Sequence, residues 1–107
     1  MIYNSIKLLL LTQKMATLIR KKVRTENLYS VGYSPGLKKY IMEITIPYKF
    51  YYQDYYEISK EEYNMFGTLK LDQLASSLVF ATTSSPRFLC SAKDGGNPEI
   101  IKKLFQK

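Results

Sequence analysis

The segment KKYIMEITIPYKFYYQDYYEI, residues 38–58, decides the fold of this chain of 107 residues and contains six of its ten tyrosines. In the first half of the segment, apolar side chains occupy every second position: Tyr40, Met42, Ile44, Ile46 and Tyr48. In the second half, four more share one parity: Phe50, Tyr52, Tyr56 and Ile58. A period of two is typical of a β-strand with one buried face, so we expect two consecutive strands here.

Shorter signals before this segment extend the predicted sheet. Aromatic and β-branched residues alternate with small ones over residues 29–33 (YSVGY), which predicts another strand. Residues 34–36 (SPG) form a turn signal, because proline presets φ and glycine tolerates positive φ. The two strands should therefore form a β-hairpin. Pro47 cannot donate a ladder hydrogen bond, so it marks a bend, a bulge or an edge position.

Three later segments carry helix signals. A capping box, SKEE, predicts a short helix over residues 60–66 that stops at Gly67. The apolar stripe of residues 69–79 predicts an amphipathic helix. Residues 99–105 predict a last helix, for which Asn97 would be the N-cap.

A short segment, residues 87–91 (RFLCS), has the pattern of a buried strand in which Cys90 is a small core residue. With the signals above, it predicts a single α+β domain over residues 1–107. In this domain an antiparallel β-sheet of about three to four strands packs against two to three helices. No repeat or linker divides the chain.

The N-terminal residues 1–24 form a basic segment outside these strand and helix signals. Its apolar residues recur at helical spacing: Ile2, Ile6, Leu9, Leu10 and Leu18. We interpret the segment as a helix docked on the domain or as a loosely packed extension. An alternative is that Met15 is the true start. The apolar run of residues 8–11 is too short for a membrane span, and its charges lie on the wrong side for a signal peptide.

Composition excludes several kinds of chemistry. The chain has one cysteine, Cys90, and no histidine. An internal disulfide, a Cys/His zinc site and histidine acid–base catalysis are therefore excluded, and a reducing compartment is indicated. No phosphate-binding glycine motif or paired carboxylates are evident either. We expect no catalytic residue, no cofactor and no metal, and hence a protein that is not an enzyme.

The formal net charge of +7 is unevenly distributed. Residues 1–49 carry nine Lys or Arg and two acidic residues, whereas residues 50–107 carry seven of each. The densest cluster of cations precedes the first expected strand: Lys14, Arg20, Lys21, Lys22 and Arg24. Such a cluster can bind a phosphate backbone or an acidic protein surface. The alternative is a solvated basic face that keeps the protein soluble.

Tyrosines occupy both faces of the second strand in the deciding segment. If only one face meets the core, Tyr51 and Tyr55 are exposed on the other. Exposed tyrosines are favoured at protein interfaces, and beside basic residues they also resemble platforms for single-stranded nucleic acid. The alternative is that helices cover both faces of the sheet.

An acidic residue, Asp54, falls on the face predicted to be buried. Either that face is exposed, or the carboxylate is buried with a partner such as Arg87 or a tyrosine hydroxyl. A structural ion pair or a local bulge explains the position better than a catalytic role.

Several segments together resemble the small immunity proteins of bacterial contact-dependent growth inhibition systems. They are residues 55–68 (YYEISKEEYNMFGT), 87–91 (RFLCS), 31–35 (VGYSP) and 43–47 (EITIP). The resemblance covers residues 29–91. It implies a cytoplasmic, non-catalytic protein that binds one cognate toxin domain. Many immunity proteins that face basic nucleases are acidic, so the positive charge of this chain implies either an acidic surface on the toxin or a contact away from its nucleic-acid groove.

The predicted partner-binding residues combine the tyrosines with the basic cluster. They are Tyr51, Tyr55, Arg20, Lys21, Lys22 and Arg24. The predicted partner is the cognate toxin domain, and the alternative is nucleic acid bound by the same residues. Neither the aromatic pattern of an RNA-recognition motif nor a KH loop is present, which favours the protein partner.

Overall fold

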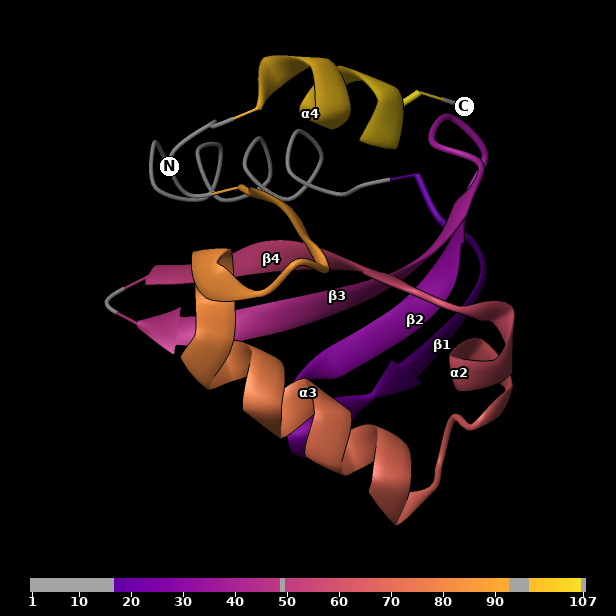
Figure 1. Cartoon of the computed structure of the whole chain (residues 1–107), viewed down its shortest axis with the longest axis vertical. Helices are drawn as coiled ribbons and strands as arrows, with labels where there is room; N and C mark the ends of the chain where they lie inside the picture. Colours follow the sequence, from indigo (N-terminus) through magenta and orange to yellow (C-terminus); the bar gives the residue numbers. More distant parts are fainter. Residues whose placement is uncertain (1–16, 49, 93–96, 107) are drawn as a thin grey trace, which may run out of the picture.

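The computed structural model describes residues 17–48, 50–92 and 97–106. Its five strands form one antiparallel sheet in which spatial order follows chain order (Figure 1). They are β1 (Ile19–Arg24), β2 (Tyr29–Ser34), β3 (Lys39–Tyr48), β4 (Phe50–Ile58) and β5 (Phe88–Ser91). The α+β class is confirmed, but the sheet has one strand more than expected. The additional strand, β1, lies in residues that we had assigned to an N-terminal extension.

The deciding segment forms the two central strands of the sheet. β3 and β4 pair without a register shift from Tyr40 opposite Ile58 to Tyr48 opposite Phe50. The predicted hairpin between β2 and β3 is also present. Pro47 occupies an edge position, one of its three predicted alternatives. The Thr45 amide donates a hydrogen bond to the carbonyl of Leu28, the residue just before β2 (2.8 Å). The Pro47 nitrogen, two residues further along β3, points to the same side, but no residue of β2 lies opposite it, so no ladder hydrogen bond is lost.

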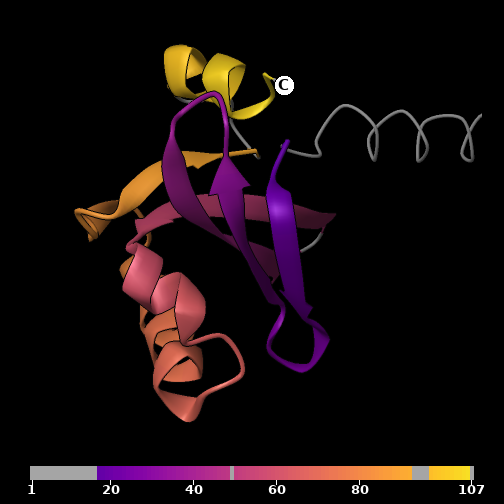
Figure 2. The same ribbon diagram turned by 90° about the vertical axis from the view of Figure 1, so that its right-hand side faces the viewer.

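Helices cover both faces of the sheet (Figures 1 and 2). They are α2 (Lys60–Asn64), α3 (Leu69–Ala81) and α4 (Pro98–Leu104), with the 3-10 turns η1 (Thr25–Asn27) and η2 (Thr82–Ser84). The capping box of α2 is confirmed: Ser59 accepts from the Glu62 amide, and Glu62 accepts from the Ser59 amide. This helix ends two residues earlier than predicted. Asn97 precedes α4 as expected, but its side-chain amide donates to the Leu89 carbonyl instead of capping the helix.

The larger core lies between the sheet and α2 and α3. The sheet contributes residues of the predicted parity, Met42 and Ile44 of β3 and Tyr56 and Ile58 of β4, together with Tyr29 and Val31 of β2. From the helices come Tyr63, Leu71, Ala75 and Leu78. Figure 2 shows both helices on the same side of the sheet.

A second, smaller core lies on the opposite face, beneath α4. Ile41, Tyr55, Cys90 and Leu104 are buried there, and the side chain of Tyr55 is only 1% exposed. The expectation that Tyr55 is exposed is therefore wrong, and its alternative, that helices cover both faces, is confirmed. The reason is that α4 (Pro98–Leu104), which begins 43 residues after Tyr55 in the chain, packs over this face. The side chain of Tyr51 lies outside the described part of the structure.

Several expectations for the first residues of the chain cannot be compared with the structure. Residues 1–16, including Lys14 and Met15, lie outside the described residues. The described chain begins beside the end of α4, where the Thr17 amide donates to the Leu104 carbonyl (3.1 Å). Leu18 then packs against the second core.

Candidate partner-binding surface

Strand β1, at one edge of the sheet, contains Arg20, Lys21, Lys22 and Arg24 of the basic cluster. Five of its six residues are exposed, and only Arg24 is half-buried. β1 pairs with β2, but its register shifts between Ile19 and Lys22, where Arg20 has a positive φ of 51°. This bulge breaks the alternation of side chains, which explains why the strand escapes a search for period-two patterns. A bulged, cationic edge also resists pairing with strands of other molecules.

Arg24 fastens the end of β1 to helix α3. Its Nε donates to Oδ1 of Asp72 (3.3 Å) and its Nη2 to Oδ2 (3.0 Å). The hydroxyl of Tyr29 donates to the same carboxylate (2.6 Å). The hydrogen bonds from Arg24, and then that from Tyr29, hold the pKa of Asp72 below its usual range. Burial, reinforced by the Asp72 carboxylate, raises the pKa of Tyr29.

Three further contacts hold the middle of β1 in place. The Lys22 ammonium lies 4.4 Å from the ring centroid of Tyr63 on α2, a cation–π contact. The hydroxyl of Tyr63 donates to the carbonyl of Arg20. On the other face of the sheet, Lys21 forms an ion pair with the nearly buried carboxylate of Glu43 (2.9 Å). Besides its pairing with β2, β1 is thus held by polar contacts to α2, α3 and β3.

These contacts change the interpretation of the predicted binding residues. Arg20, Lys21, Lys22 and Arg24 do lie together on β1, but three of them contact groups of the same chain. Among the described residues, no ion pair involves Arg20. Tyr55 lies on β4, separated from β1 by two strands and buried, so the structure does not bring it to this surface.

Exposed apolar side chains beside the cations were missed by our reasoning from the sequence. Ile19, Val23 and Leu28 are 45%, 60% and 43% exposed. Two of them lie on β1, and Leu28 closes the 3-10 turn that leads to β2. The sequence signal that could have revealed them is the pair of β-branched residues within the basic cluster. We call Ile19, Arg20, Lys22, Val23 and Leu28 the β1 surface.

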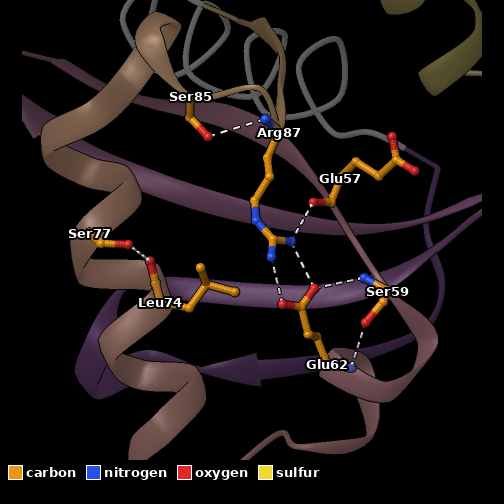
Figure 3. Close-up of polar contacts among 7 residues, drawn as sticks. All are labelled: Glu57, Ser59, Glu62, Leu74, Ser77, Ser85 and Arg87. Atoms are coloured by element: carbon orange, nitrogen blue, oxygen red, sulfur yellow. Dashed lines mark hydrogen bonds and ion pairs between the residues drawn. The ribbon is translucent and has the colours of Figure 1, made fainter.

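A second region, around Glu62 and Arg87, combines a polar cluster (Figure 3) with two hollows. Arg87 donates to both oxygens of Glu62 (2.7 Å each) and to the carbonyl of Glu57 (3.2 Å). These bonds hold the pKa of Glu62 below its usual range, assisted by the Ser59 amide. Two open hollows of about 370 Å³ flank the pair, one against α3 and one beside Pro86.

The polar groups of these hollows serve the fold. The Arg87–Glu62 pair ties α2 to the segment that enters β5, and each partner also binds the backbone. Because both carboxylate oxygens of Glu62 accept from Arg87, we assign the pair a structural role. Figure 3 shows the guanidinium pointing toward this carboxylate.

The acidic residue on the buried face, Asp54, is indeed buried. Arg87 binds Glu62, so the alternative that paired Arg87 with Asp54 is wrong. The tyrosine alternative fits better: burial, and then the Asp54 carboxylate, raise the pKa of Tyr56. The Tyr56 hydroxyl also donates to the Leu78 carbonyl (3.2 Å), which ties this part of the sheet to α3.

The described residues contain neither a candidate metal site nor a candidate membrane-spanning helix. Within residues 17–48, 50–92 and 97–106, no cluster of three or more cysteine and carboxylate side chains could hold a metal ion. None of the helices there has the length and apolar character needed to cross a membrane. No protein-family model, curated protein or solved structure matches the chain.

Proposed function

We propose that this chain is a non-catalytic binding protein that neutralises a cognate bacterial toxin domain. Its resemblance to small immunity proteins implies this role. The β1 surface supports it, because exposed apolar side chains and exposed cations occupy the same edge strand and the turn after it. One observation carries the proposal: Ile19, Val23 and Leu28 are all more than 40% exposed on a basic sheet edge. Apolar area flanked by arginine is typical of protein interfaces.

The charge of the chain indicates the kind of surface that it meets. The net charge of +7 steers it toward an acidic partner. Arg20 and the exposed Lys22 are the cations of the β1 surface that such a partner would meet first. Arg24 and Lys21 contribute indirectly, because their ion pairs hold the strand in place. We therefore place Arg20 and Lys22 in the contact, and Arg24 and Lys21 behind it.

The alternative, a nucleic-acid-binding module, has less support. It needs cations that reach phosphates and tyrosines that stack on bases. Two of the four cations in β1 already pair with carboxylates, and Tyr55 is buried. If this alternative is correct, binding will weaken steeply as salt rises.

The proposal is tested by capture followed by a growth assay. The tagged chain is incubated with nuclease-treated native lysate and washed at low and high salt. We expect one stoichiometric protein that survives high salt. When expressed alone in bacteria, this protein should stop growth, and co-expression of the wild-type chain should restore it. The variant Arg20→Glu/Val23→Ser should bind the protein at least about tenfold more weakly and fail to restore growth.

Lys102→Glu is the matched control, because Lys102 is an exposed cation on α4 and the change in charge equals that of Arg20→Glu. It should bind and protect like the wild type. A captured protein that does not stop growth would contradict the toxin role. If Lys102→Glu weakens binding and protection as much as Arg20→Glu/Val23→Ser does, the assignment of the contact to the β1 surface is contradicted. Nucleic acid that is lost with salt, with no protein remaining, would favour the alternative.

A further inference from the structure

The outer face of helix α3 has exposed apolar side chains at both ends. The helix buries Leu71, Ala75 and Leu78 against the sheet. Four residues at positions i, i+4, i+7 and i+11 lie on the opposite side: Leu69, Gln73, Ser76 and Phe80. We call them the α3 ridge. Its terminal side chains are 71% exposed at Leu69 and 88% exposed at Phe80.

This exposure is concentrated on one element. Among the described residues, six large apolar side chains are exposed, and three belong to α3: Leu69, Val79 and Phe80. Figure 1 shows α3 in front of the sheet, with no other described element covering its outer side. Single exposed apolar residues are common, but an almost fully exposed phenylalanine on a ridge with an exposed leucine indicates a contact surface.

We propose that the chain forms a symmetric homodimer in which two copies of α3 pack antiparallel along the α3 ridge. The ridge is self-complementary about a point midway along the helix. A twofold axis there places Leu69 opposite Phe80 of the second copy, and Gln73 opposite Ser76. Each large apolar end then meets the other, while the small Ser76 lets the helices approach closely at the centre.

Charge favours a second copy as the occupant. The ridge itself carries no charge, so the contact between two copies buries no charged side chain of the ridge. Lys70 lies in the first turn, where the helix dipole disfavours a cation, and the last turn contains no basic residue. Antiparallel packing brings Lys70 of each copy beside the last turn of the other helix, where carbonyl oxygens concentrate negative charge. Each copy thus supplies the cation that the other lacks.

The proposal is tested by the mass of the full chain in solution. Sedimentation equilibrium should give about twice the chain mass of 12.5 kDa. Phe80→Asp should weaken dimerisation by about 30-fold or more, as expected when a carboxylate replaces a large apolar side chain that an interface buries. Because Phe80 is almost fully exposed, far-UV circular dichroism should not change. Val23→Asp is the control: it places a carboxylate on an exposed apolar residue outside the ridge and should leave the dimer intact.

A charge exchange tests the antiparallel register. Leu69→Lys and Phe80→Glu should each be largely monomeric. When mixed, they should form a heterodimer, because one interface pair becomes lysine opposite glutamate and the other remains phenylalanine opposite leucine. A wild-type monomer at all concentrations would overturn the proposal. A dimer insensitive to Phe80→Asp, or failure of the two variants to associate, would overturn it equally.

Discussion

The contacts of β1 illustrate what single residues achieve in this protein. The strand buries little apolar surface, so its position depends on side chains that reach other elements. The strongest of these contacts joins Arg24, Tyr29 and Asp72, since two groups donate three hydrogen bonds to one carboxylate. The contact connects residues 48 positions apart in the chain and fixes the distance between β1 and α3.

Removing the charge of Asp72 should destabilise the fold at neutral pH. Its pKa is lowered in the folded state, so the carboxylate contributes stability above its unfolded pKa of about 3.9, and this contribution is lost as pH falls through the lower folded pKa. Asp72→Asn should therefore unfold at lower urea concentration than the wild type at pH 7. The difference should shrink as pH falls below about 4. Urea titrations at several pH values measure it.

The control for this prediction is Glu99→Gln on α4, which removes an exposed carboxylate far from β1. It should differ little from the wild type at any pH. A difference between Asp72→Asn and the wild type that stays constant down to about pH 2 would show that the charge is not responsible.

At the scale of elements, helix α4 turns a sheet with one covered face into one with two. It docks against Tyr55 and Cys90, and its end touches the turn between β2 and β3. Gly36 in that turn has no side chain, and a Cβ there would collide with the Lys103 carbonyl. The glycine is thus needed for close approach to α4, in addition to the turn role predicted from the sequence.

Gly36→Ala should loosen the docking of α4. The obstacle is backbone, which cannot rotate away, so the turn or the helix must shift at a cost of about 1–3 kcal/mol. Hydrogen exchange should report faster exchange of the α4 amides, and the melting temperature should fall. Pro35→Ala, in the same turn, adds no atom toward the helix and serves as the control. Unchanged α4 exchange in Gly36→Ala would refute the steric explanation.

At the scale of the whole molecule, the two cores lie on opposite faces of the same central strands. Ile41 and Met42 are neighbours in β3 that face different cores, as are Tyr55 and Tyr56 in β4. Loss of packing on one face therefore disturbs strands that the other core needs. We expect both layers to unfold together.

Truncation in either core should lower the stability of the whole molecule. Leu71 and Leu104 are fully buried in different cores, so Leu71→Ala and Leu104→Ala should each cost about 2–5 kcal/mol. Urea unfolding followed by circular dichroism and by tyrosine fluorescence should give one coincident transition in each variant. Val23→Ala, at an exposed residue, should change stability by less than about 0.5 kcal/mol. A Leu104→Ala variant that loses α4 alone would contradict a single cooperative unit.

Much of the fold is readable from patterns that span a few residues. The period of two over residues 40–58 predicts β3, β4 and the face that meets the larger core. The SKEE box and the stripe of residues 69–79 predict α2 and α3. These signals are local, because a strand or a capped helix end depends on groups within about four positions in the chain.

The candidate site was less predictable, for a physical reason. The positions of the basic cluster were found, but β1 was not, since its bulge removes the alternation and its pairing depends on β2. The partners of its cations, Glu43, Tyr63 and Asp72, lie 22 to 48 residues away from Lys21, Lys22 and Arg24. Nothing near these residues in the chain indicates which groups they meet.

Tyr55 shows which features the local sequence specifies and which depend on tertiary packing. Amino-acid order alone specifies that Tyr55 and Tyr56 point to opposite faces, since neighbouring side chains of a strand must alternate. Whether each face meets solvent or protein depends on the distant helix that packs there, and on that helix finding enough apolar area to offset its loss of freedom. Local geometry thus follows from the sequence pattern, whereas exposure, and with it the surface left for a partner, follows from packing between distant segments.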